Sequence, residues 1–352
     1  MKKREANFEL LRIVAMFMII TLHYLDKGGI LPEPTAVFSV TGYIAWGLEA
    51  FCVCAVNVYV LISAYFLAER EYQPTKVIKL WLQVFFYSVG IAGILVLTGI
   101  VPLSGLTIYE MMHYVFPVME EHYWFVTAYI FLYLLAPLMN GTLRGLPEKT
   151  YRQGILLLLV LLSLGKSFLP VKLPTDRLGY DALWFLCLYV IGVYLRYHRA
   201  GTELAVRACM KYVLCVILIY VSLVAVHGFY SRTGSLGDFI NRQYQYNSIF
   251  CLAASVFLFQ AFRHISIPSG KAASCICKIA SASFGVYLIH EHKNLRYLWP
   301  VWAGTERYAD TPLFLGHWVL TILVIYGVCM IIDLGRQYLF AWAGGIWTGK
   351  EK

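Results

Sequence analysis

The sequence has 352 residues, of which 60% are hydrophobic, 16% are aromatic and only 14% are charged, and its mean hydropathy is +0.66. Soluble domains carry about 25% charged residues, so this composition excludes an ordinary soluble protein. The net charge of +9 is spread over short loops with no basic domain outside a membrane. That pattern excludes a nucleic-acid partner and is typical of attraction to anionic lipid.

Several apolar runs approach the roughly 20 residues that cross a bilayer as a helix. We therefore predict an all-α, polytopic transmembrane helical bundle in the cell membrane, forming a single domain over residues 1–352. The ten predicted spans, the ninth of which is short, are 8–25, 42–67, 80–101, 123–140, 154–170, 181–197, 212–229, 246–262, 279–290 and 313–334. Between spans, residues 109–117 could lie along the membrane interface as an amphipathic piece.

The distribution of Lys and Arg predicts the orientation. With the N-terminus inside, nineteen of these cations fall in inner segments and nine in outer segments, and the remaining one of the 29 is Arg12 within the first span. Cytoplasmic loops carry an excess of Lys and Arg, so this bias predicts that the N-terminus and the C-terminus are both cytoplasmic.

The first span carries three ionisable side chains on one face. A helix advances about 100° per residue, so Arg12 and His23 point within roughly 20° of each other, and Glu9 lies within about 40° of His23. The rise from Arg12 to His23 is about 16 Å. Ionisable groups inside a membrane usually face a bundle interior or a wet cavity and mark function.

Four segments, in this order, resemble the acyltransferase type-three family of integral membrane O-acyltransferases. They are Glu9-x-Leu11-Arg12 with His23, the stretch Ile62-Ser63-Ala64-Tyr65-Phe66, His122-Tyr123-Trp124-Phe125 with Tyr133-Leu-Leu-Ala-Pro137-Leu, and Phe284-Gly285-Val-Tyr287-Leu-Ile-His290. The resemblance implies a ten-helix core that moves an acyl group, usually acetyl, from cytoplasmic acyl-CoA (acetyl-CoA) to a sugar hydroxyl. The implied acceptor belongs to a surface polysaccharide, a teichoic acid or a glycolipid.

Two positions depart from the family pattern. Members often have Arg-x-x-Arg at the entrance of the third span, where this chain has Lys76-Val-Ile-Lys79. Lys binds phosphate as a point charge and not as a bidentate fork. The usual Ser-Gly pair is Ser63-Ala64 here, which leaves less room for the close approach of a helix or ligand.

His23 is the best candidate for a catalytic base, because its unperturbed pKa near 6.5 suits removal of a hydroxyl proton; the alternative is a histidine that only forms hydrogen bonds. Arg12 could bind a phosphate or a carbonyl, with Glu9 orienting its side chain. The alternative is that Arg12 only forms an ion pair with Glu9. Lys76 and Lys79 could hold coenzyme A phosphates, with Ser63 nearby, or only anchor the span.

Acceptor contacts are predicted at the outer ends of the fourth and ninth spans and in the second. Each candidate could instead have a purely structural role, either at the membrane interface, where aromatic side chains form a belt, or in a hydrogen bond between helices. The candidates are His122, Tyr123, Trp124, Asn57 and His290, with Glu120 and Glu121 beside the first of them.

Neither a metal site nor a disulfide is predicted. The nine cysteines lie in spans or inner segments, and Cys275-Ile-Cys277 has no matching second pair. A transporter or flippase for a glycolipid or polysaccharide precursor is the main alternative function, although no internal repeat is visible. A sensory or scaffold protein is a third alternative, but no outer loop holds a sizeable domain.

Overall fold

The computed structural model describes residues 4–118, 122–170, 177–198 and 204–347, and every regular element in these ranges is helical. Nine helical segments in them are long and apolar enough to cross a membrane. A tenth helix, α9, is shorter, with 16 residues. The predicted all-α membrane bundle is therefore confirmed, and the protein is a multi-pass membrane protein.

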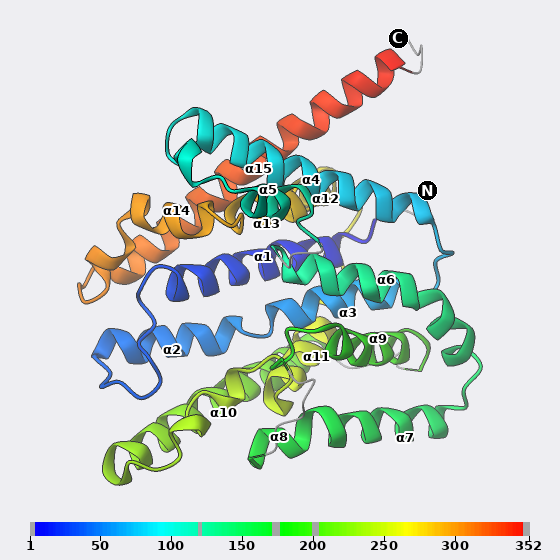
Figure 1. Cartoon of the computed structure of the whole chain (residues 1–352). Helices are drawn as coiled ribbons and strands as arrows, with labels where there is room; N and C mark the ends of the chain where they lie inside the picture. The colour runs from blue at the N-terminus through cyan, green and yellow to red at the C-terminus, as the bar shows by residue number, and fades with distance from the viewer. Residues whose placement is uncertain (1–3, 119–121, 171–176, 199–203, 348–352) are drawn as a thin grey trace.

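The spanning segments follow one another along the chain and are labelled in Figure 1. They are α1 (Ala6–Asp26), α2 with α3 (Val40–Cys52, Ala55–Leu67), α4 (Pro74–Leu97), α6 (Trp124–Leu143), α7 with a π-helical turn and α8 (Glu148–Leu159, Val160–Leu164, Gly165–Phe168), α9 (Ala182–Tyr197), α10 (Ala205–Thr233), α11 (Ile249–Arg263), α12 with α13 (Lys271–Ser281, Ser283–His290) and α15 (Phe314–Trp347). Two further α-helices lie between spans: α5 (Ile108–Val115) and α14 (Leu295–Ala303). Short 3-10 turns occupy Leu103–Gly105, Gly237–Phe239, Arg242–Tyr244 and Thr305–Tyr308.

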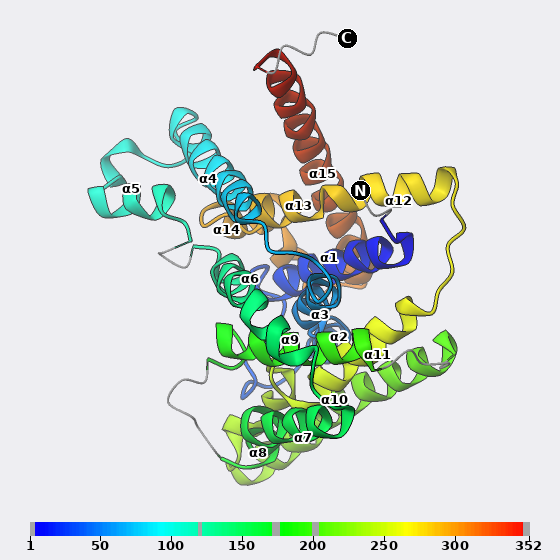
Figure 2. The same cartoon turned by 90° about the vertical axis from the view of Figure 1, so that its right-hand side faces the viewer.

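The first two spans form the centre of the bundle. In α1 67% of the apolar stretch is buried, and in α2 with α3 the value is 72%, whereas it is only 22% in α10 and in α15. The view of Figure 2 shows α1 and α3 surrounded by the other helices, with α7 and α10 at one edge. The start of α1 and the end of α15 lie toward the same end of the bundle (Figure 1), as an even number of crossings requires.

Two of the central spans are broken within the bundle. The second span is interrupted at Val53 and Cys54 between α2 and α3, and the ninth at Ala282 between α12 and α13. Irregular backbone at membrane depth is tolerated where it lines a cavity or is buried in protein. Both breaks meet that condition, because Val53 and Ser283 line the main cavity described below.

Polar side chains cap the N-termini of three helices of the bundle. The backbone N–H of Gly42 donates to Ser39 Oγ (3.1 Å), that of Trp184 to Asp181 (2.8 Å) and that of Cys251 to Ser248 Oγ (3.2 Å). Such N-caps satisfy amide donors that the helix itself leaves free. They fix where α2, α9 and α11 begin.

Several predicted span boundaries are wrong. Helices α4, α7 and α10 begin six or seven residues before the predicted 80, 154 and 212, and α15 continues beyond the predicted 334 to Trp347. The ninth span was expected to begin at residue 279, but helix α12 begins at Lys271 and makes this span 20 residues long. The outer segment 291–312, expected to be a loop, contains α14. The short helix predicted within 109–117 is present as α5, which Thr107 caps.

Close packing of α3 against α9 depends on a glycine. A Cβ added at Gly192 would lie 2.4 Å from the Cβ of Ala64 and 3.3 Å from the carbonyl oxygen of Leu61. Ala64 occupies the position at which the family that the chain resembles usually has Gly. The space for its side chain comes from Gly192 on α9, which has no Cβ.

Replacing Gly192 with Ala should therefore overpack this contact and destabilise the fold by about 1–3 kcal/mol, seen as a lower midpoint of thermal unfolding in detergent. The double variant Gly192→Ala with Ala64→Gly should recover most of the loss. Gly90→Ala is the matched control, because a Cβ there meets nothing within 4 Å. An unchanged midpoint for Gly192→Ala would show that the two helices are not packed as described.

Candidate active site

A cavity of about 800 Å³ runs beside α1 through the middle of the bundle. Small-molecule sites are usually about 300–1,000 Å³, so it is large enough for an extended substrate. From α1 it is lined at three- and four-residue intervals, by Glu9, Arg12, Met16, Ile19, His23 and Asp26. The prediction that Glu9, Arg12 and His23 share one face is confirmed.

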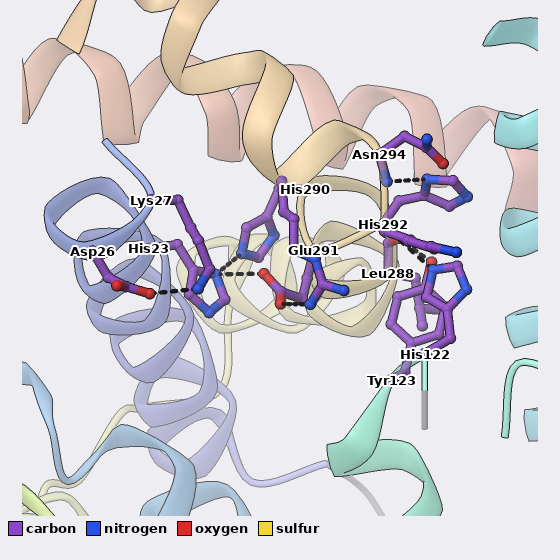
Figure 3. Close-up of polar contacts among 12 residues, drawn as sticks. His23, Asp26, Lys27, His122, Tyr123, Leu288, His290, Glu291, His292 and Asn294 are labelled. Carbon is purple, nitrogen blue, oxygen red and sulfur yellow. Dashed lines mark hydrogen bonds and ion pairs between the residues drawn. The ribbon is translucent and has the colours of Figure 1, made fainter. Parts of the chain in front are cut away.

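At one end of the cavity, His23 meets two residues from the end of the ninth span. Its Nδ1 lies 3.0 Å from His290 Nε2 and 3.1 Å from Glu291 Oε2. Figure 3 shows the two imidazoles and the carboxylate facing one another from α1 and α13. The sequence placed His23 and His290 near the outer ends of their spans, and the fold brings them into contact across 267 positions of the chain.

The contacts around His290 fix which nitrogen of each ring carries a proton. His290 Nδ1 lies 2.6 Å from the carbonyl oxygen of Val286, and a carbonyl only accepts, so this nitrogen is the donor. In a neutral imidazole the other nitrogen is then an acceptor. His23 Nδ1–H consequently donates to His290 Nε2, and the Glu291 carboxylate lies beside it without forming a hydrogen bond to the neutral ring. The proton-free nitrogen of His23 is Nε2, for which the described residues offer no hydrogen-bond partner.

Glu291 is held by a cation. Its Oε1 accepts from Arg296 Nη1 at 2.9 Å, and Arg296 also lines the cavity. Burial raises the pKa of Glu291, and the Arg296 guanidinium opposes that shift. When ionised and paired with Arg296, the carboxylate beside His23 would stabilise the imidazolium that forms when His23 takes a proton.

A second buried ion network anchors α13. A Cβ at Gly285 would lie 2.1 Å from Asp333 Cγ, so only glycine lets α13 approach α15 this closely. The Asp333 carboxylate accepts from Tyr87 (2.7 Å), Arg336 (2.8 Å) and Gln337 (2.7 Å). Helix α13 is therefore fixed one and a half turns before the residues that meet His23.

His23, His290 and Glu291 each offer one ligand atom within 4.8 Å of the others, a donor set of the type that binds zinc. Two ligands at about 2.0–2.1 Å on a tetrahedral zinc would lie roughly 3.3 Å apart. The observed 3.0 and 3.1 Å are ordinary hydrogen-bond distances. These distances also lie within about 0.3 Å of the zinc spacing, so the three side chains fit either a polar cluster or a metal, and the chelation control described below separates the two.

The opposite end of the cavity is cationic. Arg12 forms the ion pair with Glu9 that their spacing predicted, and Arg4 lies 3.7 Å from the same carboxylate. The hydroxyl of Tyr59 donates to the carbonyl oxygen of Arg12 at 2.5 Å, which ties α1 to α3 at this level. One carboxylate thus faces two guanidinium groups, and a net positive charge remains at this end.

A family model described as an acyltransferase domain matches residues 5–334. The chain belongs to this acyltransferase family. The match covers nearly the whole chain and confirms the resemblance seen in its four short segments. No curated protein and no solved structure matches the chain significantly.

Two further predicted residues of the acyltransferase line the cavity: Ser63 from α3 and Trp124 from α6. Lys76 and Lys79 are not among the described lining residues. They lie at the start of α4, and Lys76 is one turn before Leu80, which does line the cavity. Lys76 therefore lies on the same face of α4 as Leu80, whereas Lys79 is exposed.

Asn57 lies outside the cavity lining, in the packing between helices. Its side-chain N–H donates to the carbonyl oxygen of Tyr246 (2.8 Å), and its Oδ1 accepts from Trp184 Nε1 (3.0 Å). Both halves of the amide are satisfied by protein groups. Asn57 thus ties α3 to α9 and to the segment before α11. This is the bond between helices that was the alternative to a role in acceptor binding.

His122 and Tyr123 form a separate buried cluster with His292 (Figure 3). His122 Nε2 accepts from the backbone N–H of Lys293 at 2.9 Å, and the Tyr123 hydroxyl donates to the carbonyl oxygen of Leu288 at 2.8 Å. Burial lowers the pKa of His122 to about 3 and that of His292 to about 4, so both are neutral near pH 7. This cluster joins the start of α6 to the end of α13; Glu120 and Glu121 lie outside the described residues.

Sequence reasoning missed Glu291 and Arg296, which it treated as charges of an outer loop. A usable signal was the position of Glu291 directly after His290, at the end of an apolar span. It also missed Tyr287, whose hydroxyl is buried at the cavity without a hydrogen-bond partner in the described chain. A hydroxyl in this place can donate to the oxyanion of a tetrahedral intermediate.

The tautomer assignment makes His290 a positioning residue for His23. His290→Gln keeps an amide oxygen able to accept from His23 Nδ1–H and should retain activity to within about tenfold. His290→Leu removes the acceptor and should lower kcat about 10²-fold, within the range for loss of general-base function. The measurement is consumption of acetyl-CoA by purified enzyme in lipid nanodiscs.

Treatment of the wild-type enzyme with a chelator serves as the control for a metal role and should leave kcat unchanged. Equal losses in the Gln and Leu variants would contradict the assignment, because a purely structural histidine would not be rescued by an acceptor. Loss of activity on chelation, restored by added zinc, would assign the same three residues to a metal instead.

Proposed function

We propose that this acyltransferase moves an acyl group, in particular acetyl, from acyl-CoA to a hydroxyl of a cell-surface or lipid-linked carbohydrate. The observation that carries the proposal is the cavity itself. It joins a cationic end at Arg4 and Arg12 to a histidine whose Nε2 is free to accept a proton. Family membership favours acyl transfer over the alternative of a transporter or flippase.

The donor enters at the cationic end. Arg4 and Arg12 line this end, and Lys76 lies near it, so the phosphates of coenzyme A meet positive charge there. Apolar side chains follow along α1, including Met16 and Ile19. The rise of about 16 Å from Arg12 to His23 is comparable to the reach of a pantetheine arm. If the N-terminus is cytoplasmic, as the positive charges predict, the donor is taken from the cytoplasm and the acyl group is delivered toward the outer leaflet.

His23 is the general base of the transfer. As the acceptor oxygen attacks the thioester carbonyl carbon, its proton passes to His23 Nε2. The tetrahedral intermediate then collapses, the C–S bond breaks, and the thiolate of coenzyme A takes the proton from the imidazolium. Glu291 stabilises that imidazolium through Nδ1, and Arg12 and Glu9 act at the donor end. A thioester is already activated, so this sequence of steps uses only side chains of the chain.

Removing the imidazole tests this role. His23→Ala should lower kcat by about 10²–10⁴-fold, with little change in yield from membranes or in the affinity for coenzyme A. The readouts are acetyl-CoA consumption and the appearance of base-labile acetyl on surface glycans of cells expressing each variant. His198→Ala, at the end of α9 and outside the cavity lining, is the matched control. Transfer at the wild-type rate in His23→Ala would overturn the assignment.

A further inference from the structure

Two polar groups of α2 that lack a hydrogen-bond partner among the described residues lie within the wall of the cavity. The indole N–H of Trp46 and Oε2 of Glu49 are buried and have no hydrogen-bond partner in the described chain, and both residues line the cavity. Residues three apart on a helix lie on the same side, about 5–6 Å from each other. Leaving such groups unpaired is costly, so this pair is well suited to bind a ligand.

Glu49 differs from the other acids of the cavity. Glu9 pairs with Arg12, Asp26 with Lys27 and Glu291 with Arg296. Glu49 has no ion pair with any residue that the structure describes. Its function is therefore not explained by charge balance within the protein.

The pairing of a donor with an acceptor calls for a ligand that can both accept and donate hydrogen bonds. An ammonium group can only donate, and an anion can only accept, so neither satisfies both Trp46 and Glu49. A hydroxyl group donates and accepts at once. Adjacent hydroxyls on one ring would satisfy both side chains at the spacing of one helical turn.

An aromatic wall completes this part of the cavity. Tyr180 lies 4.6 Å from Trp124 and 4.5 Å from Tyr246 between ring centroids, and all three residues line the cavity. They come from the segments just before α9 and α11 and from the start of α6. The contiguous ring faces offer an apolar surface for one side of a sugar ring, whose hydroxyls would meet Trp46 and Glu49.

A second cavity of about 830 Å³ adjoins this region. The two cavities share Leu178, Asn241 and Gln245 in their walls. The second one is more polar and includes Thr35, Asp238 and Arg242. Two of its lining residues, Leu178 and Leu236, hold left-handed φ angles of 60° and 68°; such strained backbone is concentrated at functional sites.

We propose that the acceptor is a chain of at least two hydroxylated ring units that occupies both cavities. The unit being acylated stacks on the aromatic wall, and its hydroxyls bind Trp46 and Glu49. The neighbouring unit passes Leu178, Asn241 and Gln245 into the second cavity. This inference rests on the proposed transfer reaction and adds the size and binding mode of the acceptor.

The test uses glycans from cells that produce the protein, freed of acetyl groups by mild base and hydrolysed into pools of one, two and three to four units. Acetyl transfer from acetyl-CoA by the full-length protein in nanodiscs is measured for each pool. We expect kcat/KM to rise at least about tenfold from one unit to two, since a second bound unit adds hydrogen bonds. Glu49→Leu, which removes the acceptor, and Trp46→Phe, which removes the donor, should each raise the acceptor KM severalfold and leave the acetyl-CoA KM unchanged.

A matched pair of variants tests the second cavity. Thr35→Trp should fill it and remove the advantage of the longer pools, whereas Val37→Trp, two residues on at an exposed position outside both linings, should retain that advantage. Equal kcat/KM for all pools, or equal behaviour of the two Trp variants, would overturn the two-cavity proposal while transfer itself stands. An unchanged acceptor KM in both Glu49→Leu and Trp46→Phe would overturn the subsite. No transfer to any pool would instead contradict the proposed function.

Discussion

The cluster of His23, His290 and Glu291 links the first span to the ninth, and the arrangement of the cavity depends on it. Ionisable groups are expensive within a membrane unless partners surround them. The polar face of α1 must therefore turn inward, and α13 must present acceptors to it. The close contact of Gly285 with Asp333 and the break at Ala282 hold α13 where those acceptors meet His23. The same contacts leave Nε2 of His23 directed to neither partner.

The cavity separates two chemical tasks along one helix. Its Arg4 and Arg12 end has surplus positive charge, and its other end holds His23, the proposed base, beside a carboxylate. Apolar residues such as Met16 and Ile19 lie between them. A donor with a charged head and a thin arm can thus keep the head at one end while its acyl group reacts at the other. In the proposed acceptor subsite, the unpaired Trp46 and Glu49 would complete this division by offering hydrogen bonds to the acceptor.

The periodicity of α1 was sufficient to predict its polar face, because a helix repeats every 3.6 residues whatever surrounds it. Long-range contacts were not predictable in the same way. Glu291 and Arg296 resemble ordinary loop charges until the fold brings them to His23. Gly192 and Ala64 show the same limit, since their fit depends on two helices far apart in sequence. The start of the ninth span was missed because Lys271 and Lys278 lower the hydropathy of a segment that is nevertheless helical.

The protonation state of His23 is the central claim, and ¹⁵N NMR of the protein labelled at histidine measures it most directly. Spectra at neutral pH, with His23→Asn used to assign the resonances, would report which ring nitrogen carries the proton. The account predicts a proton on Nδ1 and a proton-free Nε2, with loss of this preference in His290→Leu. A proton on Nε2 in the wild-type protein would contradict the account, because His23 could not then act as a base toward the cavity.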